Sequence, residues 1–296
     1  MTRVVILGGG PGGYEAALVA AQLGADVRVV DRDGLGGSAV LTDCVPSKTL
    51  VATAEVITQV RESGELGLRI GRAKPDSGGV TVDVAKVNAR VKDLVHAQSG
   101  DVRQQLQREG IQVLPGTGLL DGPDRVAVTT GDGRTELLDA DVVLVATGAH
   151  PRVLPDAQPD GERILTWEQV YDLDTLPDRL VVVGSGVTGL EFAGAYNALG
   201  CDVVLVSSRD RVLPSEDADA ATLIEDVYKR RGMTVLSRSR AAKVTRTGDG
   251  VVVTLTDGRV VEASHCLLAV GSVPNTDGIG LDKAGVALDE RGFIEV

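Results

Sequence analysis

The sequence has few cysteines, no long hydrophobic run and a shortage of basic residues. Three cysteines among 296 residues are too few, and odd in number, for a disulfide framework, so we expect a reducing, cytoplasmic location. No apolar stretch approaches the roughly 18 residues that span a bilayer, and no signal peptide precedes the first strand-like run, so we expect no membrane segment. With 30 basic against 42 acidic residues, the net charge of −12 disfavours a nucleic-acid partner.

The most informative segment is RVVILGGGPGGYEAALVAAQLGADVRVVDRD, residues 3–33. A β-branched run leads into Gly8, Gly10 and Gly13, an Ala-rich helical stretch stops at Gly24, and a second strand ends at Asp31. In this order the first glycine permits a tight turn, the second lets backbone amides approach a pyrophosphate, and the third lets the helix pack on the strand. The terminal acid is suited to bind a ribose.

The same pattern occurs a second time over residues 180–207, with Gly184, Gly186 and Gly189. In both copies 23 residues separate the first glycine from the strand end, Asp31 in one and Ser207 in the other. Each copy is followed by a hydrophobic strand that runs into a small-residue turn, DVVLVATG at 141–148 and HCLLAVG at 265–271. The repeat predicts an α/β protein with two Rossmann-like dinucleotide-binding domains.

Other segments add helices and short strands. Apolar spacing predicts helices over 47–62 and 83–109, separated by a loop over 64–79. Strands are expected at 111–116, 125–130 and 135–146, and a hairpin at 251–263. The prolines of 151–161 predict a linker.

The two fingerprints, the loop GGSAVLTDCVPSK at 36–48, ATGA at 146–149 and VGSVPNT at 270–276 resemble the pyridine-nucleotide flavoprotein disulfide reductases, such as dihydrolipoamide dehydrogenase. The resemblance covers essentially the whole chain. It implies three-layer ββα domains: an FAD-binding domain over 1–150 with a helical insert at about 46–110, an NAD(P)-binding domain over 151–272 inserted into it, and a return to the FAD domain over 273–296. It also implies truncation before an interface domain, and a homodimer for the full-length form.

The resemblance also assigns residues to each nucleotide. Those expected to contact FAD are Gly8, Gly10, Pro11, Gly12, Gly13, Asp31, Lys48, Gly116, Thr117, Ala146, Thr147 and Gly148. Those expected to contact NAD(P) are Gly184, Gly186, Val187, Thr188, Gly189, Glu191, Ser207, Ser208, Arg209 and Gly271. Lys48 and Glu191 match a family pair beside the flavin and, with Cys44, are the catalytic candidates. The alternative is that Lys48 and Glu191 are separate surface charges.

The loop departs from the family pattern at one position, because Ala39 replaces the first of two cysteines. A dithiol relay needs two sulfurs, so the sequence excludes it. Cys44 is then either a thiolate beside the flavin or a small packing residue. The resemblance is closest to the branch of NAD(P)H:quinone reductases without the disulfide. It implies an FAD-dependent NAD(P)H oxidoreductase with a quinone-type acceptor; the alternative is a non-catalytic FAD/NAD(P)-binding regulatory protein.

A second departure concerns the nicotinamide nucleotide. Ser207, followed by Ser208 and Arg209, stands where NADH enzymes place an acid. An acid repels a 2′-phosphate, whereas hydroxyls and a guanidinium bind one, so we expect NADPH, with NADH possible. The alternative for Arg209 is a solvated surface charge. No metal site and no catalytic histidine are expected.

Overall fold

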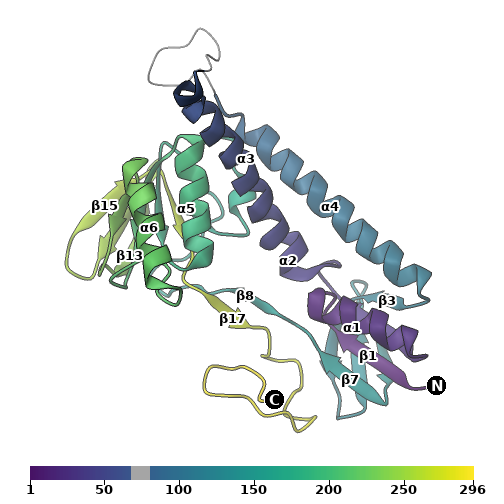
Figure 1. Cartoon of the computed structure of the whole chain (residues 1–296). Coiled ribbons are helices and arrows are strands. Elements are labelled where there is room, and N and C mark those ends of the chain that lie inside the picture. Colours follow the sequence, from purple (N-terminus) through teal and green to yellow (C-terminus); the bar gives the residue numbers. More distant parts are fainter. Residues whose placement is uncertain (68–80) are drawn as a thin grey trace. The chain divides into compact units, whose positions relative to one another are not determined.

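The computed structural model describes residues 1–67 and 81–296, and the chain divides into two compact units (Figure 1). Unit 1 consists of Met1–Val45, Asp93–His150 and Ser272–Val296. Unit 2 consists of Pro46–Lys92 and Pro151–Gly271. The loop expected over 64–79 lies, from residue 68 on, outside the described residues. Within the described ranges, no helix is both long and apolar enough to cross a bilayer.

Unit 1 is built on a parallel sheet. Its strand order is β3-β2-β1-β7, with bounds Gln112–Pro115, Asp26–Asp31, Arg3–Leu7 and Val142–Val145. Ile6 packs with Ala17 of α1 (Pro11–Gln22) on one face of the sheet. Val5 and Leu7 face the other way, toward the antiparallel sheet of β4 (Thr117–Leu120), β5 (Arg125–Thr129) and β6 (Thr135–Asp139). This helix, sheet, sheet layering confirms the predicted ββα type.

The strand predicted over 135–146 is wrong, because the structure divides it into β6 and β7, which belong to different sheets. At the break, the Ala140 amide donates to the Asp124 carbonyl at 2.8 Å and the Asp141 amide to the Arg3 carbonyl at 2.9 Å. The chain thus leaves the antiparallel sheet and joins the parallel sheet within two residues. Because both strands are apolar and adjacent, the hydrophobic pattern continues across the break and does not reveal it.

Unit 2 repeats the layering. Its parallel sheet has the order β12-β11-β10-β16-β9, with bounds Thr234–Leu236, Asp202–Val206, Arg179–Val183, His265–Leu268 and Ile164–Thr166. Val181 and Val204 pack against Val253 of a three-stranded antiparallel sheet formed by β13 (Ala241–Thr247), β14 (Gly250–Leu255) and β15 (Val260–Ala263). The hairpin predicted at 251–263 is therefore confirmed, and β13 precedes it. The helices α5 (Val187–Leu199) and α6 (Ala218–Arg230) also belong to this unit.

The remaining elements are helical or short. The segment read as a loop contains α2 (Gly37–Leu41), and α3 (Cys44–Glu62) begins three residues before the predicted helix. The long α4 (Val84–Arg108) agrees with the helix predicted over 83–109, and its Lys92 forms an ion pair of 2.7 Å with Asp172. Short 3-10 helices span Ser63–Leu66 and Val170–Asp172, and β8 (Ala149–Pro151) pairs with β17 (Ser272–Pro274).

The expected helical insert at about 46–110 is shared between the units, since residues 46–92 group with unit 2. In unit 2, α3 is attached through Arg61, whose guanidinium donates to the Ala198 carbonyl at 2.6 Å. Asn88 of α4 donates to the Leu173 carbonyl at 2.7 Å. The assignment of FAD and NAD(P) to the two parts of the chain remains a prediction.

Candidate functional site

The first glycine-rich turn connects β1 to α1. Gly8 has a φ of +104°, and a Cβ there would overlap the Ala146 carbonyl oxygen. A Cβ at Gly13 would overlap the Gly8 carbonyl oxygen. Only glycine fits these two positions, because the turn and the helix touch backbone to backbone. Gly10, Pro11 and Gly12 lie at the start of α1, where unpaired backbone amides and the helix dipole favour an anion.

The second turn, between β10 and α5, has the same geometry. Gly184 has a φ of +112°, and a Cβ added there would overlap the Ala269 carbonyl oxygen. A Cβ at Gly189 would overlap the Gly184 carbonyl oxygen, while Gly186 has open space around it. Val187 and Thr188 are the first residues of α5. The two turns are therefore structural equivalents, as their sequences predict.

Asp31 ties the first turn to the loop after β2. One carboxylate oxygen accepts from the Gly9 amide at 2.7 Å, and the other accepts from the amides of Asp33 and Gly34 at 2.9 and 2.7 Å. The carboxylate thus stabilises the turn itself, a role that the fingerprint does not reveal. Its expected interaction with a ribose remains a prediction.

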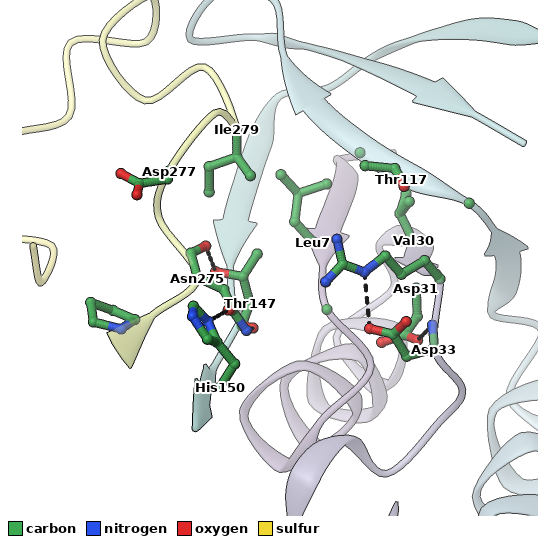
Figure 2. A pocket seen from close by; sticks show the side chains of 15 residues that line it. Leu7, Val30, Asp31, Asp33, Thr117, Thr147, His150, Asn275, Asp277 and Ile279 are labelled. Atoms are coloured by element: carbon green, nitrogen blue, oxygen red, sulfur yellow. Dashed lines mark hydrogen bonds and ion pairs between the residues drawn. The ribbon is translucent and has the colours of Figure 1, made fainter. Parts of the chain in front are cut away.

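A cleft of about 210 Å³ opens in unit 1 beside this turn (Figure 2). It is lined by five of the residues expected to contact FAD, namely Gly8, Asp31, Gly116, Thr117 and Thr147. Ala146 and Gly148 flank Thr147 in the chain. The cleft is also lined by residues that the sequence analysis did not assign to a nucleotide, namely Asn275, Asp277 and Ile279 from the last part of the chain, and His150.

Asn275 holds the turn at Thr147 in place. Its side-chain amide donates to the Thr147 carbonyl at 2.8 Å, and the Thr147 hydroxyl donates to the Asn275 carbonyl at 2.8 Å. Its side-chain oxygen lies 2.6 Å from Nδ1 of His150, and Figure 2 shows these three side chains together. The motif VGSVPNT pointed to this segment, but only the pairing of β17 with β8 brings it to the cleft.

Lys48 and Glu191 form the expected pair, which excludes the alternative of separate charges. Nζ of Lys48 lies 2.8 Å from Oε1 and 2.8 Å from Oε2 of Glu191, and Ser47 donates to Oε2 at 3.5 Å. The Lys48 side chain is 58% exposed and that of Glu191 26% exposed. Water screens such a pair, so its contribution to stability is small. Its role beside a flavin remains a prediction.

The three cysteines lie in different environments. Cys44, the first residue of α3, is exposed, and its role remains a prediction. Cys201 and Cys266 are buried. Burial raises the pKa of the Cys201 thiol to about 12 and also raises the pKa of Cys266. Both buried thiols are therefore protonated and unreactive at neutral pH.

Unit 2 has a cleft of about 430 Å³ at the ends of β10 and β11, lined by Val183, Gly184, Val206 and Ser208 among others. Ser207 does not face it. This residue is fully buried, with its hydroxyl 2.7 Å from that of Ser185. Arg209 is not among the lining residues. Gly271 follows the lining residue Val270, and its carbonyl accepts a hydrogen bond from the Arg152 amide at 2.9 Å. The structure therefore does not bring the Ser207 side chain to this cleft, because its hydroxyl is bonded inside the unit.

Two arginines that the sequence analysis missed line this cleft, Arg152 and Arg240. The signal that would have found Arg240 is the basic run SRSR at 237–240, directly after a strand of the sheet. Among the residues that the structure describes, no group of three metal-ligating side chains comes together.

A family model described as "Pyridine nucleotide-disulphide oxidoreductase" matches residues 2–296, and the chain belongs to this family. It is 53% identical over 305 residues to a protein of Mycobacterium tuberculosis named NAD(P)H dehydrogenase (quinone), covering 100% of this chain and 61% of the relative. It is 36% identical to a dihydrolipoyl dehydrogenase of Zymomonas mobilis, covering 99% of this chain and 62% of that protein. The chain thus spans about three fifths of the length of these relatives.

Solved structures agree with this assignment. The crystal structure of LpdA from Mycobacterium tuberculosis matches with a TM-score of 0.91 and 53% identity, over 98% of this chain and 63% of that one. The flavoprotein disulfide reductase RclA of Escherichia coli matches with a TM-score of 0.85 over all of this chain and 62% of that one. Its identity is 22%, so it shows the fold alone.

Proposed function

We propose that the protein is an FAD-dependent oxidoreductase that passes a hydride from NAD(P)H to FAD and the electrons on to a quinone-type acceptor. The observation that carries the proposal is the combination of two equivalent glycine turns with Ala39, which leaves Cys44 without a second loop thiol. A dithiol relay needs two sulfurs, so the electrons leave the flavin without one. The 53% identity to a protein named NAD(P)H dehydrogenase (quinone) supports this acceptor class.

The residues present fit the two nucleotides. In each unit the first and third glycines leave no room for a side chain inside the turn, and the second, Gly10 or Gly186, has no side chain to block a pyrophosphate from the backbone amides. Gly8, Gly10, Asp31 and Thr117 would hold FAD, and Gly184 and Gly186 would hold the pyridine nucleotide. When bound, FAD supplies the redox chemistry, because it accepts a hydride and releases electrons to a second substrate.

The chain's own contribution is positioning and charge. The first turns of α1 and α5 present backbone amides and the positive ends of helix dipoles to the pyrophosphates. Glu191 orients the Lys48 ammonium through a bond of 2.8 Å. We propose that this ammonium raises the flavin reduction potential, since a nearby positive charge favours added electrons. NADPH is the proposed donor, with NADH as a second donor.

The test is a two-stage flavin experiment on the purified chain supplied with FAD. Stopped-flow mixing with NADPH should bleach the flavin absorbance, and adding menadione should restore it faster than air does. Bleaching without faster recovery rejects the acceptor assignment. Nucleotide binding without acceptor-dependent NADPH oxidation supports the regulatory alternative instead. A chain that takes up no FAD contradicts the whole proposal.

A further inference from the structure

We propose that the cleft of unit 2 recognises a 2′-phosphate through Arg240 and Ser208, and not through Ser207 and Arg209, the two residues on either side of Ser208. The inference rests on the proposed function, because it assumes that a pyridine nucleotide occupies this cleft. It names the chemical feature that distinguishes the donor, a phosphate on the adenosine ribose, and the side chains that would bind it.

The cleft has the location that a dinucleotide fold uses for an adenosine. Val183 ends β10, Gly184 follows it, Val206 ends β11, and all three line the cavity of about 430 Å³. Ligands of parallel α/β sheets bind at the carboxyl ends of the strands. The residue after the second strand normally contacts the ribose, and here that residue is Ser207.

Ser207 is used for internal support. Its side chain is 0% exposed, and its hydroxyl contacts the Ser185 hydroxyl at 2.7 Å and accepts from the Arg209 amide at 3.1 Å. A ligand therefore does not reach it. This position consequently has neither a carboxylate, which would repel a 2′-phosphate, nor an accessible hydroxyl, which would bind one.

The backbone around Ser207 brings a different segment to the cleft. The Ser239 amide donates to the Ser207 carbonyl at 2.7 Å, and the Arg238 amide donates to the Arg209 carbonyl at 2.7 Å. Arg238 adopts a φ of +53°, a left-handed conformation that a non-glycine residue keeps only where its surroundings fix it. This connection places Ser208 and Arg240 on one cavity wall, although 32 residues separate them in the sequence.

The charges of the lining favour an anion. Arg152 and Arg240 line the cleft, and Asp156 is the one acidic residue among its lining residues. Within residues 1–67 and 81–296, no ion pair involves Arg240. A guanidinium can donate two parallel hydrogen bonds to a phosphate, and the neighbouring Ser208 hydroxyl adds a third donor. Arg209, in contrast, is exposed but does not line the cleft.

The test compares the binding of two nucleotides, 2′,5′-ADP and 5′-AMP, which differ only in the 2′-phosphate. Isothermal titration calorimetry on the full chain should show tighter binding of 2′,5′-ADP. Arg240→Met should weaken the binding of 2′,5′-ADP by about tenfold and the binding of 5′-AMP by less than about twofold. Arg240→Lys should keep part of the preference, because it retains the charge but not the paired donors. Arg209→Met, the matched substitution outside the cleft, should keep all of it.

Three results would overturn the inference: equal affinity of the unaltered chain for both nucleotides, loss of the preference in Arg209→Met but not in Arg240→Met, or equal weakening of both nucleotides by Arg240→Met. The last result would mean that the arginine stacks on the adenine. Circular dichroism of each variant verifies its folding. Each of these results leaves flavin reduction by NADH untouched, so the proposed function survives them. Conversely, a clear 2′-phosphate preference without flavin bleaching would reject the proposed function alone.

Discussion

Lys48 of α3 and Glu191 of α5 form a short ion pair across 143 residues of sequence, with Nζ 2.8 Å from the carboxylate. Both residues belong to unit 2, and the Ser47 hydroxyl adds a third member to the group. The ammonium therefore has a fixed partner, although more than half of the lysine side chain is exposed. A pair that adds little stability but has a defined geometry is suited to an electrostatic role at a cofactor.

Removing the Lys48 charge should affect the flavin more than the fold. In Lys48→Met we expect the free energy of unfolding to fall by less than about 1 kcal/mol, because the pair is exposed. We expect the flavin reduction potential to fall and its reduction by NADPH to slow, because a positive charge that favours the reduced state is lost. A redox titration against a reference dye and stopped-flow absorbance measure the two quantities.

Lys92→Met is the matched control, because the Lys92 side chain is exposed to a similar degree and forms an ion pair with Asp172 elsewhere in unit 2. It should leave the flavin potential unchanged. Equal shifts of the potential in both variants would show that Lys48 has no particular role.

The glycines of the second turn should separate into structural and binding positions. Gly189→Ala should destabilise the protein by about 2–4 kcal/mol, because the new Cβ overlaps the Gly184 carbonyl oxygen. Gly186→Ala should change stability by less than about 0.5 kcal/mol, because the space around it is open, yet it should weaken NADPH binding by about tenfold or more. Urea unfolding and calorimetric titration measure the two effects. If Gly189→Ala is as stable as the unaltered chain, the close contact between position 189 and the Gly184 carbonyl oxygen is contradicted.

The loop around Ala39 should regain a disulfide when its second thiol is restored. The amides of Thr42 and Asp43 donate to the Ser38 carbonyl at 3.0 and 2.7 Å, so the chain turns back between positions 39 and 44. After mild oxidation, Ala39→Cys should lose two titratable thiols and about 2 Da of mass. Ala39→Ser is the control, and it should keep its thiol count. Retention of both thiols in Ala39→Cys would show that α2 holds the loop in an incompatible geometry.

His265 should make stability depend on pH. The imidazole is buried, with Nε2 3.1 Å from the Arg163 guanidinium. Burial and then the Arg163 charge lower the pKa of His265 to about 4, against 6.5 in the unfolded chain. Between these values the unfolded state binds a proton that the folded state does not, so stability is full above about pH 6.5 and is lost as the pH falls toward 4.

The loss amounts to about 1–3 kcal/mol at most. Urea unfolding at pH 7 and pH 4.5 measures it. His265→Gln should remove this component of the pH dependence, whereas His96→Gln, at an exposed position of α4, should leave it intact. If the two variants show the same pH profile, the histidine does not titrate as described.

Local patterns predicted the parts of this protein that depend on neighbours in the chain. The glycine turns and the helices after them were predicted because a backbone contact that excludes every side chain leaves a direct trace in the sequence. The Lys48–Glu191 pair followed from resemblance to a family and is present. The division of 135–146 between two sheets was missed, because an apolar strand reads the same whichever sheet it joins.

The sequence by itself determined that the chain carries two dinucleotide turns and lacks the second thiol of a redox loop. Only the tertiary structure decided which side chains reach the clefts. Ser207 occupies the expected position but is turned inward, while Arg240, from the connection between β12 and β13, lines the cavity. The physical reason is that cavity walls are formed by strands and loops remote in sequence, and their backbone hydrogen bonds fix which residues face the ligand.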